Sequence, residues 1–153
     1  MALGMKKILI IEDDENKRND IVEFLKDNYP DKETELALSF NAGVRKAMNG
    51  RYDLMLVDMT LPKFDKDKGS NERTLHNGGE LLIGYLMDLG ISIKSIVITQ
   101  YDNFGEETLE TIDGRLKADC HETYMGTVKY NSSEDGWKYE LTKYIDNVIY
   151  SYH

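Results

Sequence analysis

Five short apolar segments alternate with five segments of helical periodicity along this 153-residue chain, and this alternation limits the possible folds more than any other feature. The predicted strands are at 6–11, which is rich in β-branched residues, at 34–40, which alternates, and at 52–58, 94–99 and 123–129. Helical spacing is found at 15–28, 41–49, 78–90, 104–118 and from about 135 onwards. Alternating strands and helices predict an α/β fold, in which a parallel sheet is covered by helices on both faces.

One domain is expected over residues 5–153, because a chain of this length with 41% hydrophobic and 31% charged residues can form a single core. The run that begins at Met5 reads as a natural start, so residues 1–4 are expected to be an expression remnant outside the fold. Residues 63–77 have no apolar period and are mostly polar, which predicts a long polar insertion loop. Within 34–40, Thr34, Leu36, Leu38 and Phe40 are predicted to share one face.

The composition excludes several classes of function. A net charge of -9 repels a phosphate backbone, so we expect no nucleic-acid partner. The chain has a single cysteine and three scattered histidines, which favours a reducing compartment and gives no zinc motif. No apolar run approaches the ~20 residues of a membrane span, and the amino terminus lacks the apolar core of a signal peptide. The expectation is a cytoplasmic protein without a membrane partner.

Polar residues stand where the predicted buried strands end. Glu12 and Asp13 follow the first strand, and Asp58 ends the third. Thr99 and Lys129 end the fourth and fifth. Because the carboxyl ends of parallel strands share one edge of the sheet, where ligands bind, these side chains are expected to meet. Three carboxylates gathered there would raise at least one pKa unless a cation neutralised them, and oxygen ligands without histidine or thiolate suit Mg²⁺.

This arrangement predicts a chemical role for Asp58. A carboxylate flanked by a metal ion and a cationic side chain can accept a phosphoryl group as an acyl phosphate. Lys129 would supply a point charge for an anionic group, and Thr99 a hydroxyl donor. Ordinary structural roles are the alternatives: acids favouring a helix amino terminus for Glu12 and Asp13, a turn before Pro62 for Asp58, a strand-end residue for Thr99 and a solvated lysine for Lys129.

The segments ILIIEDDENKR, YDLMLVDMTLP, SIVIT and TVK, in this order, resemble the receiver domain of two-component response regulators. The resemblance runs from about residue 5 to the end of the chain. It implies a flavodoxin-like, doubly wound, five-stranded parallel sheet of order 2-1-3-4-5 with helices on both faces. It also implies that Asp58 is the phosphoacceptor, Thr99 the switch hydroxyl and Lys129 the phosphate-pairing lysine. The implied Mg²⁺ ligands are Glu12, Asp13, Asp58 and the backbone carbonyl of Thr60.

The implied function is that of a stand-alone response-regulator receiver domain in a two-component system or phosphorelay. A histidine kinase or phosphotransfer protein would phosphorylate Asp58 in a Mg²⁺-dependent reaction, and a conformational change would signal to a downstream protein that the sequence does not name. Such a domain is not an enzyme for a separate substrate, since it catalyses only its own phosphorylation and dephosphorylation. Whether it forms a homodimer is left open.

Three residues depart from the family pattern, and they support an alternative. Gln100 is larger than the residue usual after the switch hydroxyl, Gly126 stands where the switching aromatic is usual, and Tyr130 replaces the proline after the lysine. The alternative is a degenerate pseudo-receiver that acts as a phosphorylation-independent interaction module. A haloacid-dehalogenase-type phosphatase would need a second acid where Thr60 stands, and no Gly-x-Gly-x-x-Gly of a dinucleotide-binding oxidoreductase follows the first strand.

Overall fold

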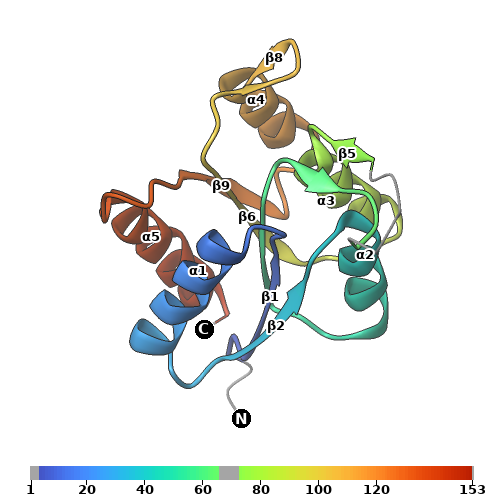
Figure 1. The fold of residues 1–153 in the computed structure, drawn as a ribbon. Helices are drawn as coiled ribbons and strands as arrows, with labels where there is room; N and C mark the ends of the chain where they lie inside the picture. The colour runs from blue at the N-terminus through green and yellow to red at the C-terminus, as the bar shows by residue number, and fades with distance from the viewer. Residues whose placement is uncertain (1–3, 66–72, 153) are drawn as a thin grey trace.

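Five parallel strands form the central sheet of the computed structural model, which describes residues 4–65 and 73–152 (Figure 1). The strands are β1 (Lys7–Ile11), β2 (Glu33–Ala37), β3 (Leu54–Val57), β6 (Lys94–Thr99) and β9 (Tyr124–Lys129). Their order across the sheet is β2-β1-β3-β6-β9. Numbered as the five main strands, this is the order 2-1-3-4-5, so the predicted flavodoxin-like fold is confirmed.

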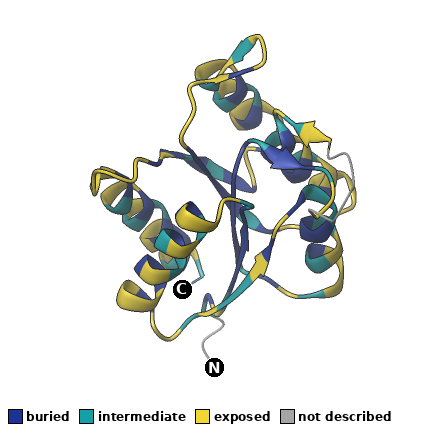
Figure 2. Cartoon of the chain, in the orientation of Figure 1, coloured by how far each residue is buried: buried dark blue, intermediate teal, exposed yellow. Residues whose placement is uncertain are grey.

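Five helices within residues 4–65 and 73–152 cover the two faces of the sheet. They are α1 (Glu15–Asn28), α2 (Phe40–Asn49), α3 (Gly78–Asp88), α4 (Leu109–Asp119) and α5 (Gly136–Ser151). One apolar cluster lies between the sheet and helices α1 and α5, and a second lies between the sheet and helices α2, α3 and α4. Figure 2 shows the buried strands between helices whose outer faces are exposed. None of the helices in the described parts of the chain is both long and apolar enough to cross a membrane.

In the part of the chain that the structure describes, two short antiparallel strand pairs lie outside the main sheet. Strand β4 (Leu61–Pro62) pairs with β5 (Thr74–Leu75), and β7 (Asn103–Phe104) pairs with β8 (Glu107–Thr108). The first hairpin joins the two ends of the predicted polar loop, whose residues 66–72 lie outside the described residues. Residues 1–3 of the predicted expression remnant also lie outside them. That residues 5–153 form one domain stays a prediction.

Two predicted boundaries are wrong by about three residues or more, and both errors have a local cause. The helix predicted from residue 104 begins at Leu109, because the β7–β8 hairpin precedes it and the Thr108 hydroxyl caps its first turn. The strand predicted to reach residue 40 ends at Ala37, because Ser39 caps α2 by accepting a hydrogen bond from the Ala42 amide at 3.1 Å. Strand β2 is an edge strand, so Leu36 and Leu38 are exposed and do not form a core face.

Candidate functional site

Asp58 lies directly after β3 at the carboxyl edge of the sheet. Ile11 of β1 pairs with Val57 of β3. Glu12 follows Ile11 and Asp58 follows Val57, so these two acids are neighbours. The backbone hydrogen bonds continue this register by one residue, since the Asp58 amide donates to the Ile11 carbonyl at 3.1 Å. The parallel register therefore brings together two carboxylates that are 46 positions apart in the sequence.

Three carboxylates meet at this edge. One oxygen each from Glu12, Asp13 and Asp58 lies within 4.8 Å of the others. Glu12 is 1% exposed and Asp58 is 8% exposed, whereas Asp13 is half-buried. The structure thus brings together the three acids that the sequence placed at the strand ends.

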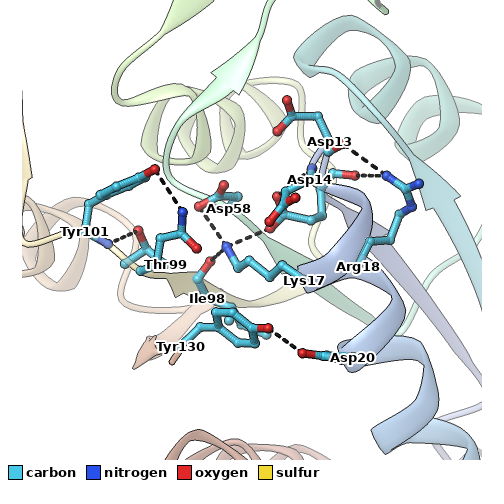
Figure 3. Close-up of polar contacts among 12 residues, drawn as sticks. Asp13, Asp14, Lys17, Arg18, Asp20, Asp58, Ile98, Thr99, Tyr101 and Tyr130 are labelled. Carbon is cyan, nitrogen blue, oxygen red and sulfur yellow. Dashed lines mark hydrogen bonds and ion pairs between the residues drawn. The ribbon is translucent and has the colours of Figure 1, made fainter. Parts of the chain in front are cut away.

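Lys17 is the residue that the sequence analysis missed. Its ammonium lies between the acids, 2.7 Å from Glu12 Oε1 and 3.1 Å from Asp58 Oδ1, and it donates to the Ile98 carbonyl at 2.6 Å (Figure 3). The side chain is only 1% exposed. A signal was present in the sequence, because Lys17 falls on the same helical stripe as Ile21 and Phe24, which face the core. A charged residue on an apolar stripe needs a partner, and here it has two carboxylates.

Burial controls the electrostatics of the two most enclosed acids. Loss of solvent raises the pKa of Glu12 to about 8, with the negative charge of Asp58 adding to the rise and the ammonium of Lys17 opposing it. Loss of solvent also raises the pKa of Asp58 above its ordinary value, again opposed by Lys17. The pocket therefore favours either a proton or a cation on its carboxylates.

The predicted switch hydroxyl and phosphate-pairing lysine end on neighbouring strands but differ in their surroundings. Thr99 is fully buried, and its hydroxyl oxygen accepts a hydrogen bond from the Tyr101 amide at 3.3 Å (Figure 3). Lys129 is exposed and its ammonium pairs with Asp102. The side chains of β9 alternate, and since Val128 and Tyr130 face the α1–α5 core, Lys129 between them projects from the opposite face of the sheet, where it is exposed. The lysine that contacts Asp58 is Lys17.

Tyr130, which departs from the family pattern, connects the end of β9 to the acidic pocket. Its ring centroid lies 5.8 Å from the Lys17 ammonium and 5.2 Å from the ring centroid of Trp137. Its hydroxyl donates to Asp20 of α1, which fixes the ring beside the lysine. An aromatic ring thus helps to enclose the ammonium of Lys17.

The other two residues that depart from the family pattern are Gly126, within β9, and Gln100, directly after β6. Gly126 has a φ of 151°, and a Cβ at this position would lie 2.5 Å from the Tyr144 ring of α5. The space beside β9 at this position is therefore filled by an aromatic residue of α5. Gln100 is exposed, and its amide donates to the Tyr101 hydroxyl at 2.9 Å.

The donor set of the pocket fits a hard divalent cation. Its ligand atoms are carboxylate oxygens, which Mg²⁺ prefers. Asp58 Oδ1 is enclosed and, among the described residues, has no hydrogen-bond donor beyond its ion pair with Lys17. That the Thr60 carbonyl is a further ligand stays a prediction.

Other proteins resemble this chain in sequence or in fold. No protein-family model matches the chain. It is 27% identical to the uncharacterized protein y4jR of Sinorhizobium fredii, over 86% of this chain and 91% of that protein. The structure is similar to the CheY-like response regulator receiver domain protein of Methanospirillum hungatei JF-1, with a TM-score of 0.65, 21% identity and coverage of 97% and 96% of the two chains.

A second solved structure extends the comparison to a ligand-bound protein. The response regulator protein TrrA of Thermotoga maritima, solved in complex with Mg²⁺-BeF, matches with a TM-score of 0.56 and 20% identity over 92% of this chain and 99% of that one. At these identities the similarity concerns the fold. This chain has the fold of response-regulator receiver domains.

Proposed function

We propose that this chain is a receiver domain that accepts a phosphoryl group on Asp58. The observation that carries the proposal is the meeting of Glu12, Asp13 and Asp58 at the carboxyl edge of a receiver fold, with ligand oxygens within 4.8 Å of one another. TrrA, a response regulator protein of the same fold, was solved in complex with Mg²⁺-BeF, and this supports Mg²⁺ as the metal ion of the proposed site.

Asp58 is the nucleophile in this proposal. One of its carboxylate oxygens attacks the phosphorus of a phosphohistidine, an oxygen–phosphorus bond forms, and the nitrogen–phosphorus bond breaks with its electron pair passing to the imidazole. Lys17 contacts the enclosed oxygen, Oδ1, which leaves Oδ2 as the oxygen for the attack. Thr99 and Lys129, which end the neighbouring strands, are proposed to contact the transferred group.

Glu12, Asp13, Asp58 and the Thr60 carbonyl would hold the Mg²⁺ ion. Bound there, a divalent cation supplies positive charge that offsets the charge developing on the phosphoryl oxygens. The chain's own residues place the nucleophile: the backbone of β3 fixes Asp58 beside Glu12, and their burial excludes water from the carboxylates.

Intact-protein mass spectrometry after treatment with acetyl phosphate and Mg²⁺ tests the proposal. The wild-type protein should gain the mass of one phosphoryl group, and Asp58→Asn should gain none, because the amide is not a nucleophile for this reaction. Asp27→Asn is the matched control, since it removes an exposed acid from the last turn of α1, away from the pocket. Equal labelling of wild type and Asp58→Asn would overturn the proposal.

A pseudo-receiver is the second candidate, and the position of Lys17 favours it. An ammonium already pairs with Asp58, while Lys129 pairs with Asp102. A protein that binds its partner equally well before and after acetyl phosphate treatment, and that takes up no phosphoryl group, would be an interaction module of this kind.

The remaining parts of the proposal concern partners and location. The phosphodonor would be a histidine kinase or a phosphotransfer protein, and the signal would pass to a downstream protein through a shift between two conformations. We propose a cytoplasmic location, no nucleic-acid or membrane partner, and no catalysis beyond the domain's own phosphorylation and dephosphorylation. A homodimer is compatible with this function.

A further inference from the structure

Lys17 makes a complete set of contacts inside the acidic pocket. An ammonium has three donors, and that of Lys17 faces three acceptors from three different strands or strand ends. They are Glu12 Oε1 after β1, Asp58 Oδ1 after β3 and the Ile98 carbonyl of β6, at 2.7, 3.1 and 2.6 Å. Lys17 therefore places a positive charge from helix α1 where the ends of β1, β3 and β6 lie close together (Figure 3).

The surroundings are built to keep this charge in place. A lysine that is 1% exposed is rare unless it is paired, because removing an ammonium from water is costly. Here the ring of Tyr130 faces the ammonium at 5.8 Å, and the Tyr130 hydroxyl is itself bonded to Asp20. Ile21, one turn farther along α1, continues the buried stripe on which Lys17 lies.

We propose that Lys17 is the resident cation of this pocket, and that a divalent cation binds to the same carboxylates only against its repulsion. The ammonium neutralises part of the charge that would attract the metal ion, and it lies within 3.1 Å of two of the three acids. In an enclosed site such charges interact strongly because little water separates them. Lys17 thus lowers the affinity of the pocket for Mg²⁺. When the metal ion binds, Asp58 must either contact both Lys17 and the ion or exchange Lys17 for the ion.

This inference rests on the proposed function for its biological purpose. The effect of Lys17 on Mg²⁺ affinity can nevertheless be measured without any phosphoryl transfer. Isothermal titration of Mg²⁺ into unphosphorylated protein gives the affinity directly. Lys17→Met, which keeps an unbranched apolar side chain of similar length, should bind Mg²⁺ at least tenfold more tightly than wild type. The matched control is Lys26→Met, which removes the same charge from an exposed position on α1 and should stay within twofold of wild type.

A second variant and a second measurement test the inference even if the Lys17→Met protein does not fold. Lys17→Gln removes the charge but keeps hydrogen-bond donors for the Ile98 carbonyl, and it should tighten Mg²⁺ binding in the same direction. In thermal unfolding, Mg²⁺ should raise the melting temperature of either variant by more than that of wild type, because tighter binding to the folded state stabilises it more. Should Lys17→Met unfold without metal, Mg²⁺ should restore its folded far-ultraviolet circular dichroism spectrum.

The outcomes separate this inference from the proposed function. Equal or weaker Mg²⁺ binding by both Lys17 variants would overturn the role of Lys17 as a competing cation, even if Asp58 is labelled. A wild-type protein that is not labelled by acetyl phosphate, in contrast, would overturn the proposed phosphorylation while leaving the difference in Mg²⁺ affinity intact.

Discussion

The two halves of the sheet's carboxyl edge use lysine in opposite ways. On the β1–β3 side, Lys17 is buried and pairs with Glu12 and Asp58. On the β6–β9 side, Lys129 is exposed and pairs with Asp102, whose side chain is 75% exposed. Both lysines lie near the end of a strand, yet only the one on the helix reaches the acids. The position of a charge in the sequence therefore says less about its role than the side of the backbone from which it projects.

The same difference sets the energies of the two ion pairs. Removing one member of a buried pair leaves an uncompensated charge in the interior, whereas an exposed pair competes with water and contributes little. We therefore make three predictions, and the failure of any one would weaken the contrast between the buried pairs of Lys17 and the exposed pair of Lys129.

Lys17→Met should have the largest effect on stability. With the ammonium gone, Glu12 and Asp58 face each other without a cation, and we expect the free energy of unfolding to fall by about 3–5 kcal/mol. Urea unfolding followed by circular dichroism at neutral pH without divalent metal measures this change. A loss below about 1 kcal/mol would mean that the lysine is not an essential partner of the acids.

The pH dependence of stability should show an intermediate effect. The pKa of Glu12 is near 4.5 in the unfolded chain and about 8 in the folded protein, so the folded state binds more protons between these values. Stability that is present below pH 4.5 is therefore lost as the pH rises toward 8, on the order of 1 kcal/mol per pH unit. Glu12→Gln should flatten this decline between pH 5.5 and 8 in metal-free urea unfolding. A decline of the same slope in wild type and variant would assign the titration to another group.

Lys129→Ala should have the smallest effect. Its pair with Asp102 is exposed, so we expect a change of less than about 1 kcal/mol in the free energy of unfolding. The same urea titration at two salt concentrations checks this, because any contribution of an exposed pair should shrink as salt is added. A loss above about 2 kcal/mol would show that Lys129 has a partner inside the pocket, and the contrast between the two lysines would disappear.

Much of the fold and part of the site could be predicted from the sequence. The apolar strands and the helical stripes are local patterns, and they predicted the alternating α/β fold and helix α1 with its bounds at Glu15 and Asn28. The sheet order was predicted from the resemblance to receiver domains. The short hairpin before α4 was missed because two-residue strands such as β7 and β8 carry no periodicity. Leu36 is exposed because β2 is an edge strand, which is covered less than its hydrophobic alternation suggests.

The sequence by itself determined which acids would meet, because parallel strands end at one edge and Glu12, Asp13 and Asp58 all stand at strand ends. Only the tertiary structure decided which cation joins them. Whether a lysine reaches a pocket depends on how its helix is rotated against the sheet and on how side chains alternate along a strand, and packing sets both. Lys17 on the inner stripe of α1 therefore lies against Asp58, while Lys129 on the outer side of β9 lies against Asp102.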